Sequence, residues 1–295
     1  MAWSATVPGA VLIVNPFASR VDEERIARVA AALGDPDVVR TERAGHAVEL
    51  VRELGPGRPA VYVYSGDGGC NEALNGSDGS VPLGFVPGGN TNVLPRALGL
   101  PRDPVAAARA LASARPRRIS VGRVNGRRFG FSAGLGLDAE FVRRVDALGR
   151  AASGRRPGDV RFALTALRLL VERRFRFDPA LEVGGHGRVA FLLVANGDPY
   201  TYAGPVPLHL VPRARFEGGL DAVGPPSFRL RNVPGALVYL ATGRPALPLL
   251  SLADEDLIVA RCDAPTPLQV DGEDLGDVTE ARFEAERDAV TVLVP

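Results

Sequence analysis

Short apolar runs alternate with helical patterns through the first 120 residues, and this alternation limits the fold more than any other feature of the sequence. Apolar runs of this length are typical of strands in a parallel sheet that is buried on both faces. The runs are AVLIV (10–14), DVVRT (37–41), AVYVY (60–64) and LGFV (83–86). Helices are predicted over 22–33 and 46–54 and from Asp103-Pro104 onward, where aspartate can cap and proline suits the first helical position. The pattern predicts a Rossmann-like open α/β domain, and such sheets bind ligands beyond the carboxyl ends of their strands.

The pattern changes after about residue 120, where strand-like segments separated by Gly, Pro and Asp turns predominate. These segments predict a mostly antiparallel β-sandwich domain, interrupted by one helix from Val160 to about Glu172. A chain of 295 residues exceeds the typical single core of about 150, so two domains are expected. We predict an α/β domain over 1–120 and a β-rich domain over 121–295, whose final strand is free to pack back on the first. An arginine-rich segment, 149–159, is predicted to be a solvated loop, with lipid-surface contact as an alternative.

The charge balance excludes several classes of function. The chain has 35 Lys+Arg and 34 Asp+Glu residues, a formal charge of +1, which gives no general attraction to nucleic acid. No nucleic-acid partner is therefore expected. Every basic residue apart from histidine is arginine, and the absence of lysine excludes Schiff-base chemistry and the Walker A loop.

Cysteine usage and hydropathy bear on the cellular compartment. Cys70 and Cys262 are too few for a disulfide framework, which favours a reducing cytoplasm. The first residues lack the basic region and cleavage site of a signal peptide, and the apolar stretch over 233–250 is interrupted by Arg244 and by prolines. No stretch approaches the roughly 20 uncharged residues that a membrane span needs. We expect a soluble cytoplasmic protein without a transmembrane segment, with peripheral attachment to the inner face of the membrane left open.

Glycine-rich and amide-rich loops follow three of the predicted strands. Asn15 and Ser19 follow the first run, and Gly88, Gly89 and Asn90 follow the last. After the third run, SGDGG (65–69) lets successive backbone N–H groups converge on an anion, and a helix predicted to begin near Asn71 would add its positive end. Each loop alone is better explained as a tight turn. Together, on one edge of one sheet, they predict a polyphosphate site.

The order and spacing of five motifs resemble the diacylglycerol kinase catalytic domain family, the soluble bacterial type related to sphingosine and ceramide kinases. The motifs are VNPFAS (14–19), SGDGGCNEALNG (65–76), PLGFVPGGNTNVLPRALGLP (82–101), FSAGLGLDAEFV (131–142) and LQVDGEDLG (268–276). NAD kinases are more distantly similar. The Asn71-Glu72 pair and the late DGE favour the lipid branch. The resemblance implies an ATP-dependent kinase whose two domains enclose the active site between them.

The resemblance also implies roles for individual residues. Glu217 would take the place of an aspartate linked to a structural Mg²⁺, and Asp271 and Glu273 would lie near the lipid hydroxyl. The residues implied to bind the nucleotide are Asn15, Pro16, Phe17, Ala18, Ser19, Thr41, Ser65, Gly66, Asp67, Gly68, Gly69, Cys70, Asn71, Glu72, Gly89 and Asn90.

Phosphoryl transfer needs positioning, Mg²⁺ and one carboxylate that accepts the hydroxyl proton. Asp271 and Glu273 are predicted to alternate on a strand end and share a face, with Gly272 leaving room for substrate. A surface turn is the alternative, and it is the preferred interpretation of DGE taken alone. We assign Glu273 as the general base, with Asp271 close behind. Asp67 is expected to hold Mg²⁺, polarise a hydroxyl or bond neighbouring backbone donors, with a plain turn-forming role as the alternative.

Several residues depart from the family pattern. Gly69 stands where threonine is usual, Ser65 where glycine is usual, and Asn90 where threonine or serine is expected. Ser120 and Glu217 each replace an aspartate. Each of the loop changes removes or exchanges a hydroxyl group near the phosphates, so weaker nucleotide binding or loss of the Mg²⁺ is left open.

The leading hypothesis is transfer of the ATP γ-phosphate to a diacylglycerol-like lipid at a membrane surface. Phosphorylation of a sphingoid base or of NAD is an alternative, as is a nucleotide-binding or lipid-binding protein without turnover. ATP and Mg²⁺ are the expected cofactors, a lipid substrate is the expected partner, and a homodimer is left open.

Overall fold

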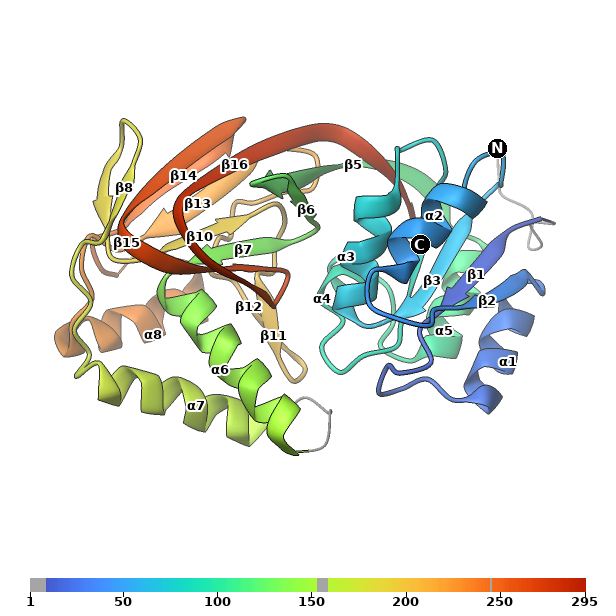
Figure 1. Cartoon of the computed structure of the whole chain (residues 1–295), viewed down its shortest axis with the longest axis horizontal. Helices are drawn as coiled ribbons and strands as arrows, with labels where there is room; N and C mark the ends of the chain where they lie inside the picture. Colours follow the sequence, from blue (N-terminus) through green and yellow to red (C-terminus); the bar gives the residue numbers. More distant parts are fainter. Residues whose placement is uncertain (1–8, 153–158, 245) are drawn as a thin grey trace. The chain divides into compact units, whose positions relative to one another are not determined.

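The computed structural model describes residues 9–152, 159–244 and 246–295 (Figure 1). The chain forms two compact units. One, here called the α/β unit, runs to Val121 and includes Arg287–Pro295; the other, the β unit, is Gly122–Glu286. Both boundaries fall within long strands, β5 (Arg115–Val124) and β16 (Glu273–Val294).

The α/β unit contains a parallel sheet in the order β4-β3-β1-β2. The end of β16 lies beside β4, where Val292 pairs with Leu83 in parallel. The strands are β1 (Val11–Val14), β2 (Asp37–Arg40), β3 (Val61–Ser65) and β4 (Leu83–Pro87). The helices are α1 (Glu23–Ala32), α2 (His46–Leu54), α3 (Asp67–Gly76), α4 (Val93–Ala97) and α5 (Pro104–Ala112). The predicted open α/β fold is confirmed.

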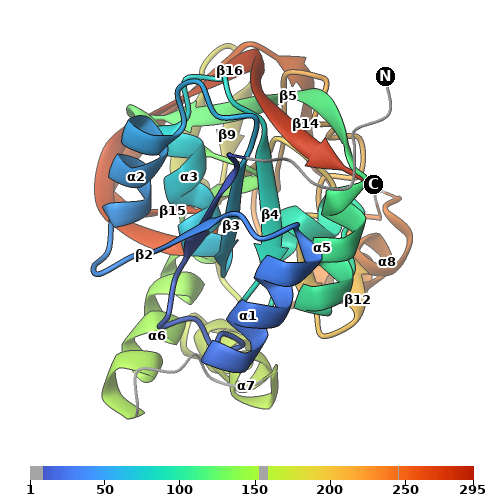
Figure 2. The same cartoon turned by 90° about the vertical axis from the view of Figure 1, so that its right-hand side faces the viewer.

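Helices cover both faces of this sheet, with α1 and α5 on one side and α2 and α3 on the other (Figure 2). Asp22 and Asp103 cap α1 and α5, because their side chains accept hydrogen bonds from the backbone N–H groups of Arg25 and Ala106. One apolar cluster joins these helices to the sheet, and it includes Leu12, Val14, Ile26, Val29, Tyr62, Tyr64, Val105, Ala108 and Leu111. The buried sheet therefore holds the carboxyl ends of β1, β3 and β4 in fixed register.

Helix α3 begins earlier than the sequence predicted. Its first residue is Asp67, not a residue near Asn71, and the N–H of Cys70 already donates to the carbonyl of Gly66 at 3.1 Å. Gly68 and Gly69 therefore lie in the first turn of a helix and not in a flexible loop. Glycine is a poor helix former, which is why the pattern favoured a loop there.

The β unit is built mainly from antiparallel strands, as the sequence predicted. The path β14-β13-β10-β7-β15-β16 is antiparallel at every pair, and β8 and β9 extend it beside β15. Besides β5 and β16, whose bounds are given above, the strands of the β unit are β6 (Arg127–Phe129), β7 (Ser132–Leu135), β8 (Leu181–Val183), β9 (Gly187–Val189), β10 (Leu192–Ala195), β11 (Thr201–Ala203), β12 (Val206–Leu208), β13 (Leu220–Gly224), β14 (Leu250–Glu255) and β15 (Leu257–Val270).

More helix is present in the β unit than the single predicted segment. The helices are α6 (Leu137–Ala152), α7 (Asp159–Glu172), α8 (Val233–Thr242) and the short 3-10 helix η1 (Leu230–Asn232), and Figure 1 shows α6, α7 and α8 on one side of the strands. Residues 149–152 of the segment predicted as a basic loop are the end of α6 and Asp159 begins α7, whereas its residues 153–158 lie outside the described residues. Across the described ranges, no helix is long and apolar enough to span a bilayer.

Candidate active site

Three loops of the α/β unit meet at the carboxyl ends of β1, β3 and β4. The N–H of Gly88 donates to the carbonyl of Ser65 at 2.7 Å, and the N–H of Arg20 donates to the carbonyl of Gly88 at 2.9 Å. Side chains join the same loops, since Ser19 Oγ donates to Asn90 Oδ1 at 3.0 Å. The sequence predicted this gathering of loops, and the structure contains it.

The first loop presents short polar groups. Asn15 Oδ1 accepts the N–H of Phe17 at 3.0 Å, while Asn15 Nδ2 donates to Ser65 Oγ at 3.2 Å. Phe17 is 77% exposed, so it contributes no packing to the core. Thr41, directly after β2, is buried, and its N–H donates to the carbonyl of Val14. Pro16 and Ala18 complete this loop.

The glycines of the second and third loops allow two stretches of backbone to pass closely. A Cβ built on Gly89 would lie 2.8 Å from the Cα of Gly66 and 3.1 Å from Asn92 Oδ1. Asn92, with φ of 52°, accepts from the N–H of Gly89 and donates back to its carbonyl. Gly66 is the N-cap of α3 and has no side chain with which to cap the helix. The start of α3 is therefore bare of an N-cap side chain, which suits an anion.

Asp67, the first residue of α3, contacts α4. Its Oδ1 accepts the N–H of Val93, the first residue of α4, at 2.6 Å, and Asp67 is buried. Of the roles expected for Asp67, bonding to neighbouring backbone donors is the one that these contacts display. A negative charge beside the positive end of α4 is favourable, so an aspartate is tolerated at the start of α3. Its catalytic role stays a prediction.

Cys70, Asn71 and Glu72 of α3 contact the protein itself. Cys70 and Asn71 are both 1% exposed, and Asn71 accepts hydrogen bonds from Asn75 Nδ2. The Glu72 carboxylate accepts the N–H groups of Gly45 and Ala47 at 2.8 and 3.1 Å, so it caps α2. Nucleotide contacts of these residues stay a prediction, and the structure gives Glu72 a separate structural role.

In the β unit, Asp271 and Gly272 form the turn between β15 and β16. Their φ angles are 47° and 81°, and Val270 pairs with Glu273 across the turn, as in a two-residue type I′ hairpin. The prediction that Asp271 and Glu273 alternate along one strand is therefore wrong. An Asp-Gly pair between apolar runs is a hairpin signal, because both central residues must adopt positive φ. Gly272 meets this requirement without strain.

The Asp271 side chain is buried and holds this turn in place. Its two oxygens accept the N–H groups of Gly130, Phe131 and Ser132 at 2.7, 3.0 and 3.1 Å, and the N–H of Asp271 donates to the carbonyl of Ser132. Asp271 thus fastens the turn to the segment that joins β6 and β7. Its contacts are those of a positioning group.

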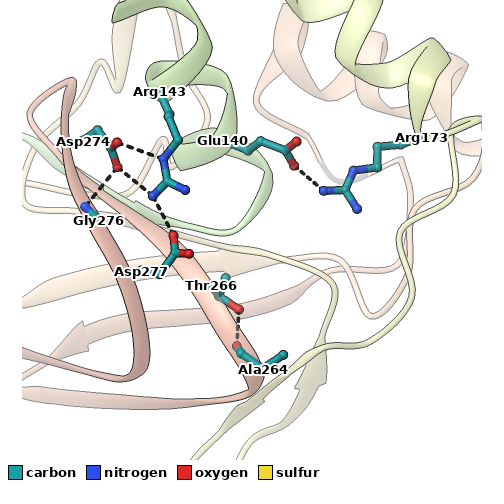
Figure 3. A network of polar contacts seen from close by, with 8 residues as sticks. All are labelled: Glu140, Arg143, Arg173, Ala264, Thr266, Asp274, Gly276 and Asp277. Carbon is teal, nitrogen blue, oxygen red and sulfur yellow. Dashed lines mark hydrogen bonds and ion pairs between the residues drawn. The ribbon is translucent and has the colours of Figure 1, made fainter. Parts of the chain in front are cut away.

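Glu273 and the residues after it form ion pairs. Glu273 Oε2 lies 2.5 Å from the NH2 atom of Arg127, and both side chains are about one third exposed. Arg143 of α6 binds Asp274 through two nitrogens at 2.8 and 3.0 Å and Asp277 at 2.6 Å (Figure 3). The hydrogen bond with Asp274 raises the pKa of Arg143 above its ordinary value. The hairpin that carries Glu273 is therefore held to α6.

The sequence analysis did not single out Asp138. This residue, in the first turn of α6, is half-buried, and its Oδ2 accepts from Tyr200 Oη at 2.8 Å and Gln269 Nε2 at 2.6 Å. Gln269 Oε1 in turn accepts the N–H of Gly272 at 2.9 Å. Burial raises the pKa of the Asp138 carboxyl, against the effect of its two hydrogen bonds. The aspartate within the apolar segment FSAGLGLDAEFV was the available signal.

Glu217, the predicted metal ligand, lies exposed in a turn of the β unit. Nearby along this sheet, Asp254 accepts the N–H of Gly219 and Asp221 accepts the N–H of Asp254. Over residues 9–152, 159–244 and 246–295, no group of three or more His, Cys, Asp or Glu side chains is arranged to hold a metal ion. The metal role of Glu217 stays a prediction, as does an active site shared by the two units.

Comparison with known proteins shows what the α/β unit resembles. Its architecture is an open α/β domain with a glycine-rich turn at the start of a helix. Residues 9–124 match the model described as "Diacylglycerol kinase catalytic domain". The resemblance that the motifs indicated is therefore confirmed.

Curated relatives match over part of their length. The chain is 32% identical over 144 residues to a "Probable lipid kinase YegS-like" of Chromohalobacter salexigens, covering 46% of each chain. It is 38% identical over 86 residues to a "Diacylglycerol kinase" of Bacillus subtilis, covering 28% of each. The chain spans about half the length, or less, of the curated relatives it matches.

Solved structures share the fold along the whole chain. A "putative diacylglycerol kinase" of Bacillus anthracis aligns with a TM-score of 0.78 at 22% identity, covering 100% of this chain and 96% of that one. An NAD kinase of Archaeoglobus fulgidus in complex with ATP aligns with a TM-score of 0.50 at 14% identity, covering 96% and 92%. At these identities the likeness shows the fold alone.

Proposed function

We propose that this protein is an ATP-dependent lipid kinase that transfers the γ-phosphate to the hydroxyl of diacylglycerol or a similar lipid. The observation that carries the proposal is the meeting of three loops at the bare start of α3, within the residues that match the diacylglycerol kinase catalytic domain. The relatives named as lipid kinases support the substrate class.

The residues at the meeting loops suit a nucleotide phosphate chain. The start of α3 supplies backbone N–H groups and the positive end of the helix dipole, both of which favour anions. Asn15, Ser65, Ser19 and Asn90 add short amide and hydroxyl groups, already tied to one another by hydrogen bonds. Because these groups are fixed before binding, little conformational freedom is lost when the phosphates bind.

Magnesium fits this proposal as a companion of the nucleotide. Mg²⁺ in kinases is held by one or two carboxylates together with substrate phosphates, so a protein-only cluster of acidic residues is not required. Asp67 is the acidic side chain at the meeting loops. When bound, the ion neutralises charge on the phosphates.

In the proposed reaction, Glu273 accepts the proton of the lipid hydroxyl. The hydroxyl oxygen forms a bond to the γ-phosphorus, the bond from that phosphorus to the bridging oxygen breaks, and ADP leaves with the electron pair. Arg127 holds the Glu273 carboxylate by an ion pair, and Asp271 holds the turn beneath it. Asp271 therefore serves as a positioning residue in this proposal.

Helix α7 supports action at a membrane. Leu164, Leu167 and Val171 repeat at helical spacing on one face of α7, and all three are more than half exposed. Arg168 lies on the same face with its side chain 84% exposed, and Arg173 and Arg174 follow the helix and are exposed. An apolar stripe flanked by arginines fits the surface of a bilayer that contains anionic lipid. We propose that the protein docks peripherally on such a surface.

The decisive experiment incubates the protein with labelled ATP, Mg²⁺ and a panel of diacylglycerol, a sphingoid base and NAD. Label in diacylglycerol is expected. Label in the sphingoid base or in NADP would support those alternatives instead, and nucleotide binding without a product would support a protein without turnover.

Two variants test the assigned base. Glu273→Gln is expected to reduce the rate by about a hundredfold or more, since a positioned general base contributes about 10²–10⁴-fold. Glu280→Gln is the matched control, because Glu280 lies on the same strand and pairs with Arg261 at 3.0 Å. Equal rates in the two variants would remove Glu273 from the mechanism.

A further inference from the structure

Ser65 and Gly69 face one another across the turn that leads from β3 into α3. A Cβ built on Gly69 would lie 2.2 Å from Ser65 Oγ and 2.6 Å from Ser65 Cβ. Carbon atoms that are not bonded prefer separations of about 3.5–4.0 Å, so neither distance is tolerable. Residue 69 must therefore be glycine while residue 65 carries a side chain.

Rotation of Ser65 does not relieve this exclusion. A new rotamer would move Oγ, but Ser65 Cβ is fixed by the backbone of β3 and stays 2.6 Å from the added atom. Alanine at position 65 would exclude a side chain at 69 for the same reason. Glycine at position 65 would remove both close contacts. The two positions thus share one side-chain volume.

The Ser65 hydroxyl fills that shared volume and is held in one orientation. Ser65 is 2% exposed, and its Oγ accepts Asn15 Nδ2 at 3.2 Å. The amide of Asn15 is itself fixed, because its Oδ1 accepts the N–H of Phe17. A hydroxyl that accepts from Asn15 keeps its own proton for donation. This donor lies beside the first turn of α3, whose N-cap residue, Gly66, has no side chain.

We propose that the Ser65 hydroxyl contacts a nucleotide phosphate and that it stands in for a hydroxyl at position 69. The inference rests on the proposed kinase function and deepens it. Gly69 and Ser65, named above as two separate departures from the family pattern, are then one exchange in which the hydroxyl moves from one wall of the shared volume to the other. Weakened nucleotide binding is not expected from this exchange.

Thermal unfolding without nucleotide tests whether side chains at positions 65 and 69 exclude one another. Gly69→Thr is expected to lower the melting temperature by about 5 °C in the wild-type background, because overpacking costs about 1–3 kcal/mol. The same loss is expected with Ser65→Ala, which keeps Cβ. With Ser65→Gly the loss should disappear, since threonine then has room. Equal losses in all three backgrounds would overturn the shared volume.

Calorimetric titration with a non-hydrolysable ATP analogue and Mg²⁺ tests whether the Ser65 hydroxyl contacts a phosphate. Ser65→Gly is expected to bind about tenfold more weakly, as for loss of one hydrogen bond to a charged group. Adding Gly69→Thr should restore affinity to within about threefold of wild type. Adding Gly69→Val, which has the same shape without a hydroxyl, should not. Adenosine, which has no phosphate, is the control ligand and should bind all variants alike.

The outcomes separate this inference from the proposed function. Equal affinities of the Thr and Val double variants would show that the hydroxyl is not a phosphate contact, while the kinase proposal would stand. Failure of the wild-type protein to bind the analogue would overturn both the proposed function and the proposed contact between the Ser65 hydroxyl and a phosphate. In that case the unfolding measurements would still show whether positions 65 and 69 share one side-chain volume.

Discussion

The carboxylate of Asp67, at the first residue of α3, accepts the backbone N–H of Val93, at the first residue of α4, with a distance of 2.6 Å. Because both groups are buried, the N–H would be left without this acceptor in an Asp67→Ala variant. We expect a loss of about 1–3 kcal/mol in the free energy of unfolding, measured in urea.

Asp67→Asn separates this structural contact from chemistry. The amide oxygen can still accept the N–H of Val93, so unfolding should change little. If the charge of Asp67 also serves Mg²⁺ or the phosphates, kcat should fall while stability is kept. A variant with full activity would assign Asp67 to the contact with Val93 alone.

Gly89 is expected to tolerate substitution less well than Gly66. A Cβ on Gly89 would lie 2.8 Å from the Cα of Gly66, whereas one on Gly66 would lie 3.4 Å from the Cα of Gly89. Gly89→Ala should therefore lower the free energy of unfolding by about 1–3 kcal/mol, the usual range for overpacking. Gly66→Ala should cost less and serves as the comparison in urea titrations. The reverse order would contradict the close passage of these two backbones.

The fold of the α/β unit could be predicted because local signals and tertiary packing agree there. Buried strands appear in the sequence as continuous apolar runs, and Asp22 and Asp103 indicate where the helices that they cap begin. The start of α3 was misplaced because glycines have low helix propensity, while the helix is held by tertiary contacts such as that of Asp67 with Val93. Propensity alone could not reveal that contact.

The glycines of the candidate site were selected from the sequence because they leave the backbone bare, and their part in nucleotide binding stays a prediction. A sequence can indicate that backbone is bare, but it cannot say what approaches it. At Gly89 the neighbour is the backbone of Gly66, and at Gly69 it is the side chain of Ser65. The Asp271-Gly272 turn was likewise read as strand, because a short Asp-Gly pair between apolar residues fits both patterns until the φ angles are known.

Glu72 links α3 to the start of α2. Its carboxylate accepts the N–H groups of Gly45 and Ala47, and the helix N-terminus favours its negative charge. Glu72→Ala should destabilise the protein by about 1–2 kcal/mol, as loss of a helix cap does. Glu72→Gln should cost less, since one oxygen remains. If Glu72 only caps α2, both variants should bind an ATP analogue with wild-type affinity. Weaker binding by the folded Glu72→Gln variant would instead support the predicted nucleotide contact.

The exposed stripe on α7 predicts binding to anionic vesicles. Replacing Leu164, Leu167 and Val171 by serine should reduce cosedimentation with phosphatidylglycerol-containing vesicles by about tenfold or more, because apolar area no longer enters the interface. The protein should keep its melting temperature, since these side chains are exposed. Val206→Ser, at another exposed valine of the β unit, is the control. Unchanged sedimentation of the triple variant would exclude α7 as the docking surface.

The pKa of the Asp138 carboxyl is raised by burial, and this gives stability a defined dependence on pH. In the unfolded chain an aspartate has a pKa of about 3.9. Between that value and the higher pKa of the folded protein, the folded state holds more protons, so its stability falls as pH rises through this window. Asp138→Asn removes this contribution, while its amide oxygen can still accept from Tyr200 and Gln269.

Urea unfolding at about pH 4 and about pH 7 tests this dependence. The free energy of unfolding of Asp138→Asn, measured relative to that of wild type, should be larger at the higher pH. Only the wild type must bury a carboxylate there. Tyr200→Phe should act in the opposite direction, since it removes a donor that stabilises the charged form of Asp138. A difference between Asp138→Asn and wild type that is the same at both pH values would show that the Asp138 carboxyl is not the group that titrates.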